Sequence, residues 1–153
     1  MIGPRLQRIR RTRGFTLIEL LIVVAIIGII AAIAIPNLLQ AIDRGKQKRT
    51  MADIRSIATA VEQYSIDHTI YPGVNTIAAL PAVVEPMYIQ TVPQKDGWGR
   101  LFVVDSTSTD YTLGSGGKDG GALNAVGGPT GNFNDAIIFS NGQFYQWPEG
   151  TQI

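Results

Sequence analysis

Hydrophobic residues fill one unbroken stretch near the start of the chain and recur only at intervals after it. Residues 15–35 read FTLIELLIVVAIIGIIAAIAI, in which only Thr16 and Glu19 are polar. As a helix with a rise of ~1.5 Å per residue this stretch would be roughly 32 Å long, which matches the ~30 Å hydrocarbon thickness of a bilayer. The pattern therefore predicts a membrane-spanning helix over residues 15–36.

A second pattern begins beyond Pro36, where apolar residues recur at intervals of three and four. This spacing is typical of one face of an amphipathic helix. We expect that helix to span residues 37–72 and to end near Tyr71-Pro72-Gly73, because proline disfavours helix for the residue before it and glycine suits a chain reversal. Its apolar face, which we expect to pack on a sheet, comprises Met51, Ile54, Ile57, Ala58, Val61 and Tyr64.

From residue 73 onward the pattern changes to short apolar runs separated by glycine, proline and asparagine. Such runs predict β-strands, and Asn141-Gly142 between two of them is the strongest short-range signal of a hairpin. The fold class is therefore α+β, with a long N-terminal helix packed on a small antiparallel β-sheet in a head over residues 73–153. We expect a short helical turn at residues 77–80 and three to four strands, at residues 101–104, 111–113, 136–140 and 143–147.

Charge is distributed unevenly along the chain. Five arginines precede Phe15, so the rest of the chain holds 8 basic and 12 acidic residues. A nucleic-acid-binding domain would gather Lys and Arg on its folded surface, so we expect no nucleic-acid partner. By the positive-inside rule the basic leader, residues 1–14, stays in the cytoplasm. The pattern then predicts a single-pass membrane protein whose head is extracytoplasmic. The absence of cysteine excludes disulfides, thiolate metal sites and a cysteine nucleophile.

Two simpler explanations of the apolar stretch are a signal peptide and a plain membrane anchor. A signal peptide has an apolar core of about 7–15 residues before its cleavage site, whereas this run continues into helical sequence. Glu19 argues against a plain anchor, because an acidic residue in a membrane helix costs on the order of 2.5–3.5 kcal/mol at the centre and less toward the interface. Such a charge needs a partner, and a free α-amino group on a neighbouring helix would suit it.

The residues Arg13-Gly14-Phe15-Thr16-Leu17-Ile18-Glu19 resemble the processing site of type IV pilins and type II secretion pseudopilins. The resemblance implies that a prepilin peptidase cleaves after Gly14 and methylates the new N-terminal residue, Phe15. It also implies that Glu19 is the assembly carboxylate. In that role Glu19 pairs with the amino group of an adjacent subunit, so that each subunit docks at the correct axial stagger.

Gly28 and Pro36 mark the weakest part of the predicted stem, because glycine and proline both disfavour a helix interior. By the same resemblance, filaments of the family lose helicity in this stretch, which predicts a helix break. An ordinary proline kink in a membrane helix is the alternative for Pro36.

The head carries a second resemblance. The turn Asp96-Gly97-Trp98-Gly99, the strand Tyr111-Thr112-Leu113 and a glycine-rich loop resemble the major pseudopilin (G type) of type II secretion systems more than the adhesive pilins, although the family often has proline where this chain has Gly97. The resemblance implies a structural subunit that polymerises with itself into a periplasmic or extracellular filament that drives protein export. Its partners would be the prepilin peptidase, the inner-membrane assembly platform, and minor pilins or pseudopilins. A major pilin of a surface pilus, a single-pass anchored binding module and a membrane-anchored enzyme are the alternatives.

The glycine-rich loop is also a candidate metal site. Eight glycines lie between Gly114 and Gly131. Glycine allows tight turns that expose carbonyl oxygens, and Ca²⁺ takes six to eight oxygen ligands. The resemblance implies calcium here, with the carbonyl of Leu113 and the carboxylates of Asp119 and Asp135 as candidate ligands. The family commonly reads Leu-Gly-Ala-Asp-Gly where this chain reads Leu113-Gly114-Ser115-Gly116-Gly117, so a principal carboxylate is absent. A flexible loop without metal is the alternative.

Catalytic motifs are absent from the sequence. The single histidine, His68, falls near the expected helix end, where a solvent-facing or capping role is the ordinary one. The glycine-rich stretch lacks the Gly-Lys-Ser/Thr ending of a phosphate-binding loop. We therefore expect no enzyme.

Overall fold

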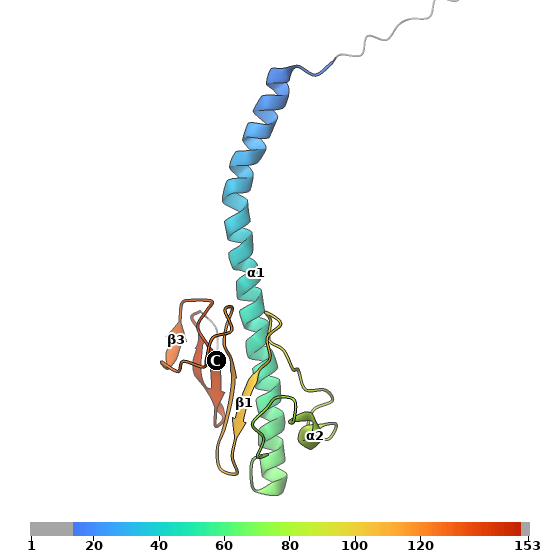
Figure 1. Ribbon diagram of the computed structural model, residues 1–153, viewed down its shortest axis with the longest axis vertical. Helices are drawn as coiled ribbons and strands as arrows, with labels where there is room; N and C mark the ends of the chain where they lie inside the picture. The colour runs from blue at the N-terminus through green and yellow to red at the C-terminus, as the bar shows by residue number, and fades with distance from the viewer. Residues whose placement is uncertain (1–13, 151–153) are drawn as a thin grey trace, which may run out of the picture. The chain divides into compact units, whose positions relative to one another are not determined.

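The structure is a computed structural model that describes residues 14–150. The predicted basic leader, apart from Gly14, lies outside the described residues. The chain divides into two compact units that meet between Leu39 and Gln40. The first contains the start of α1, a helix over Leu17–His68, and the second contains the rest of α1 and the other described elements (Figure 1).

The first unit is an apolar helix whose described side chains are mostly exposed. Large apolar side chains are exposed along all of it, with Leu17 at 80% and Ile29 at 65% exposure. Among the described residues, α1 is the one helix that is long and apolar enough to cross a membrane. This agrees with the membrane stem expected over residues 15–36.

In this single chain α1 is continuous through Gly28 and Pro36. The loss of helicity expected there in filaments stays a prediction. Proline at residue 36 removes the amide donor that the Ala32 carbonyl would otherwise accept. One residue further on, the side-chain amide of Asn37 donates to the Ile33 carbonyl at 3.1 Å. A side chain at Gly28 would meet open space, so the packing of this single chain does not require glycine there.

The second half of α1 carries the predicted apolar stripe. Ile54, Ile57 and Val61 are buried. The helix ends at His68, short of the predicted end at residue 72, because Thr69 takes a left-handed φ of 63° and its N–H donates to the Ser65 carbonyl at 2.8 Å. A left-handed residue with this bond is a common helix terminator.

A five-stranded sheet lies beside this half of α1 (Figure 1), in the order β1-β2-β4-β5-β3. The four expected strands pair antiparallel, and Asn141-Gly142 forms the turn of the β4–β5 hairpin with φ of 47° and 91°. The sequence missed β3, which pairs parallel with β5, so the sheet is mixed. The expected helical turn is followed by a short helix, α2. The bounds are α2 Pro81–Val84, β1 Val103–Ser106, β2 Tyr111–Ser115, β3 Gly128–Thr130, β4 Ile137–Ser140 and β5 Gln143–Pro148.

The hydrophobic core lies between α1 and the sheet. Ile54 and Leu113 are fully buried within it, and Tyr111 is 1% exposed. The Tyr111 hydroxyl donates to the half-buried Glu62 at 2.6 Å. Burial and this hydrogen bond raise the pKa of Tyr111. The observed fold is the α+β arrangement predicted from the sequence.

Candidate functional site

The start of α1 is closed by a pair of reciprocal hydrogen bonds. Gly14 and Phe15 are exposed and precede the helix. The Thr16 backbone N–H and hydroxyl donate to Glu19 Oε2 at 2.9 and 2.7 Å, and the Glu19 N–H donates to the Thr16 hydroxyl at 3.3 Å. This is a capping box, which satisfies two of the free amides at a helix start. Sequence reasoning missed the role of Thr16, although Thr-x-x-Glu before an apolar run is its signal.

Glu19 has no cationic partner within the part of the chain that the structure describes, where the ion pairs are Arg49–Asp53 and Lys118–Asp43. The capping box therefore supplies its hydrogen bonds but does not neutralise its charge. In a low-dielectric surrounding a nearby cation would still be strongly attracted to this carboxylate. The geometry thus leaves Glu19 able to pair with a cation from another molecule.

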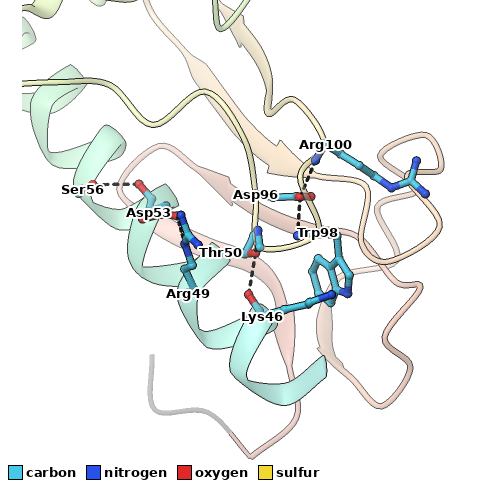
Figure 2. Close-up of polar contacts among 9 residues, drawn as sticks. Lys46, Arg49, Thr50, Asp53, Ser56, Asp96, Trp98 and Arg100 are labelled. Carbon is cyan, nitrogen blue, oxygen red and sulfur yellow. Dashed lines mark hydrogen bonds and ion pairs between the residues drawn. The ribbon is translucent and has the colours of Figure 1, made fainter. Parts of the chain in front are cut away.

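The second group of candidate residues surrounds the predicted turn at Asp96, and Figure 2 shows its contacts. Asp96 is 4% exposed. Its Oδ1 accepts the backbone N–H groups of Trp98 and Arg100, both at 2.9 Å (Figure 2). Its Oδ2 accepts the hydroxyl of Ser115 on β2 at 2.6 Å. One carboxylate therefore closes the turn and ties it to the sheet.

The same turn docks on α1 through Gly97. The Gly97 N–H donates to the Thr50 hydroxyl at 2.9 Å, and that hydroxyl donates to the Lys46 carbonyl at 2.8 Å. A side-chain carbon at Gly97 would collide with the Lys46 carbonyl. Glycine is needed here for close approach, and the proline common in the family would lack the N–H that Thr50 accepts.

Asp43 on α1 joins the turn to the glycine-rich loop. Its Oδ1 accepts the Trp98 indole N–H at 3.2 Å, and its Oδ2 lies 2.8 Å from the Lys118 ammonium. The hydrogen bond from Lys118 lowers the pKa of Asp43, partial burial opposes this shift, and Trp98 and the charge of Lys46 reinforce it. The sequence analysis did not single out this carboxylate, because its partners are 55 and 75 residues away.

The three predicted calcium ligands do not form a cluster of acidic side chains. Leu113 is buried on β2, Asp119 is exposed in the loop, and Asp135 is half-buried before β4. Asp119 Oδ1 accepts the Gly121 N–H at 3.0 Å. Within residues 14–150, no group of three or more His, Cys, Asp or Glu side chains is placed to hold a metal ion. The described acidic side chains therefore do not converge on one point. Because Ca²⁺ also takes backbone carbonyl oxygens, calcium stays a prediction from the resemblance.

Two further features bear on catalysis. His68 is exposed at the end of α1, its Nδ1 lies 3.1 Å from the Tyr64 carbonyl, and its ring stacks on Tyr64 with centroids 4.0 Å apart. These contacts agree with the helix-end role expected for it. A cleft of about 540 Å³ opens beside Gln47 and is lined by Arg44, Lys48 and Glu149, without a histidine or paired carboxylates.

Comparisons with known proteins match two families over the start of α1 and over the region that contains the Asp96 turn. Residues 9–35 match the prokaryotic N-terminal methylation motif, which covers the junction of Gly14 and Phe15 and also Glu19. Residues 37–130 match the family "Type II secretion system (T2SS), protein G", which covers Asp43 and Asp96.

Individual relatives extend these matches over most of the chain. Type II secretion system core protein G of Vibrio cholerae is 33% identical over 84% of this chain and 97% of its own length. The proteins of the same name from Pseudomonas aeruginosa and Escherichia coli are 33% and 29% identical, over 75% and 86% of this chain and 92% and 91% of their own lengths. The methylation motif at the start of the exposed apolar stem, the protein G match over residues 37–130 and the relatives that cover most of the chain lead to one conclusion: the chain belongs to the type II secretion system protein G family.

Proposed function

We propose that this chain is the structural subunit of a type II secretion pseudopilus, cleaved after Gly14 by a prepilin peptidase, methylated on Phe15, and polymerised through the apolar part of α1. One observation carries the proposal. The stem is apolar and exposed all round, and a single carboxylate without a cationic partner among the described residues stands at its start. The methylation motif spans this same segment.

In this proposal the exposed stem occupies two environments in turn, first the membrane and then the filament. Apolar side chains without a protein partner must be covered by lipid or by other apolar surface. In the stored subunit the stem would lie in the inner membrane, with the head on the extracytoplasmic side. In the filament, the stems of neighbouring subunits would cover one another. Head-to-tail contacts that do not close into a ring generate a helical fibre.

In this proposal Glu19 sets the axial register of neighbouring subunits in that fibre. Cleavage after Gly14 would create an α-amino group on Phe15, close to the capping box of its own helix. Glu19 of one subunit and the amine of the next would neutralise each other only at one axial stagger. A buried charge pair of this kind is a known means of fixing register, because the misaligned arrangement leaves both charges unpaired.

The expected partners follow from this proposal. They are further copies of the chain, the prepilin peptidase, the inner-membrane assembly platform and the minor pseudopilins. The filament would occupy the periplasm and act mechanically in protein export. This role asks for no catalytic group, and the relatives are named as core proteins of the secretion system.

The test uses two variants that separate charge from helix capping. Glu19→Ala removes both the charge and the capping acceptor, whereas Glu19→Gln keeps a side-chain oxygen that can accept from Thr16. The full chain is expressed with the assembly machinery, and the membrane-bound and sheared filament fractions are quantified. We expect both variants to insert and to be processed, and both to be lost from filaments. Asp105→Ala, at an exposed residue of β1, is the control that assembles normally.

The outcomes distinguish the parts of the proposal. Normal assembly of Glu19→Gln with failure of Glu19→Ala would show that only the capping box matters. Normal assembly of both variants would refute the register role of Glu19. Absence of wild-type filaments, with the chain retained in membranes, would refute polymerisation itself.

A further inference from the structure

The glycine-rich loop that follows β2 is anchored to α1 by a protein cation. The Lys118 ammonium lies 2.8 Å from Asp43 Oδ2. The Asp43 side chain is 10% exposed, whereas that of Lys118 is 51% exposed. The loop thus brings its charge to a nearly buried carboxylate on the helix, at the point where Trp98 also donates to that carboxylate.

A second cation holds the same loop from the turn. The Arg100 guanidinium donates from Nη2 to the Lys118 carbonyl at 3.1 Å. It also packs against Gly120, whose φ is 70° and where any side-chain carbon would collide with the guanidinium. The backbone of Arg100 is itself fixed by Asp96. The position of the loop is therefore set from α1 and from the turn at once.

Backbone contacts seat the loop on the segment before β4. The Lys118 N–H donates to the Phe133 carbonyl at 2.9 Å. Gly117 has φ of 74°, and a side-chain carbon there would lie 2.6 Å from the Asp135 carbonyl oxygen. The Gly117 N–H donates to the Ser115 hydroxyl at 3.2 Å. Glycine is used here for close approach of two backbone segments, with their amides paired.

These positive groups stand beside the position where the resemblance places a divalent cation. Lys118 precedes the candidate ligand Asp119, and Arg100 covers the following turn. A positive charge near a cation site opposes occupancy by a second cation. Within residues 14–150, no three acidic, histidine or cysteine side chains gather to offset these charges.

We propose that Lys118 and Arg100 hold the glycine-rich loop to α1 in this chain, so that the head folds and keeps the loop seated without a divalent cation. The proposal goes beyond polymerisation, because it concerns the folded subunit before assembly. Calcium would then have no effect on the stability of this subunit, and loss of the Lys118 charge would.

The experiment measures the thermal midpoint of the full chain in detergent micelles by intrinsic tryptophan fluorescence, with Trp98 reporting beside the loop. Wild type is compared in excess calcium chloride and in excess EGTA, and we expect midpoints that agree within about 1 °C, since no ligand free energy is lost. Lys118→Met should lower the midpoint by about 3–8 °C in both buffers, because it leaves a nearly buried carboxylate without its cation.

Lys48→Met is the matched control. It makes the same change at an exposed residue of α1 whose side chain has no hydrogen bond or ion pair within residues 14–150, and we expect a shift below about 2 °C. Lys118→Arg, which keeps the charge, should recover most of the loss.

Two results would overturn the proposal. The first is a wild-type midpoint that is several degrees lower in EGTA and is restored by calcium. This result does not depend on whether any variant folds. The second is a Lys118→Met midpoint equal to that of Lys48→Met. Both are measured on the unassembled subunit, so a failure here is distinct from a failure to form filaments.

Discussion

Asp96 makes the sharpest prediction about the head, because one buried carboxylate accepts three hydrogen bonds. Two come from the backbone of its own turn, at Trp98 and Arg100, and the third comes from Ser115 on β2. Asp96→Ala would remove all three hydrogen bonds without changing the apolar core. Asp96→Asn would keep an oxygen for the two amides but present an N–H₂ group to the Ser115 hydroxyl.

The expected loss follows from the number of donors left without a partner. A hydrogen bond contributes about 0.5–1.5 kcal/mol net, and somewhat more when the acceptor is charged, while donors near the surface can recover part of this from water. About 1 kcal/mol for each of three donors gives a loss of about 3 kcal/mol for Asp96→Ala. For a domain of this size that corresponds to a fall in thermal midpoint of about 9–15 °C. We expect about 1 kcal/mol for Asp96→Asn.

The assay is reversible thermal unfolding of the full chain in detergent, followed by circular dichroism and tryptophan fluorescence. Asp105→Ala removes a carboxylate from an exposed residue of β1 and should stay within about 0.5 kcal/mol of wild type. If Asp96→Ala unfolded within about 2 °C of wild type, the turn would not depend on this carboxylate, and the account of how turn, sheet and α1 are joined would be wrong.

Two further predictions concern the docking of the turn on α1. Gly97→Ala should lower the free energy of unfolding in urea by about 1–3 kcal/mol, because its side chain would meet the Lys46 carbonyl. Gly73→Ala is the control, because a side chain there would meet open space. Equal urea midpoints for the two variants would contradict the close approach at Gly97. The second concerns Asp43, whose pKa is lowered by Lys118. Its contribution to stability is therefore present above the ordinary aspartate pKa of about 3.9 and is lost as the pH falls through the lowered value in the folded state. The free energy of unfolding measured against pH should show this acid loss in wild type and a smaller one in Lys118→Met, and identical profiles would count against the ion pair.

Much of the fold could be predicted because the signals are local. The apolar run to residue 35 is independent of tertiary context, and the spacing of Ile54, Ile57 and Val61 places one helix face in the core. Asn141-Gly142 likewise sets its own turn. The strand β3 could not be read in this way, because Gly128-Pro129-Thr130 has poor strand propensity and pairs only because β5 offers an edge.

The contacts of the head depend on residues far apart in sequence. A turn and a loop dock on α1 and so bring together Asp43, Trp98 and Lys118. The local sequence around each of these residues does not predict its contact with the other two. The sequence analysis therefore identified the turn but missed the carboxylate beneath it. At the stem the signal is local, because Thr16 and Glu19 are three residues apart, yet their capping box was also missed.

The central claim, that this chain is a processed pseudopilus subunit, is tested most directly at its N-terminus. We would determine the intact mass and the N-terminal sequence of the protein from membranes of cells with and without prepilin peptidase. The account predicts a chain that begins at N-methylated Phe15 when the peptidase is present and an uncleaved chain when it is absent. A retained Met1 in both cells, or cleavage at another residue, would contradict it and make the chain an anchored protein whose Glu19 serves only its own helix.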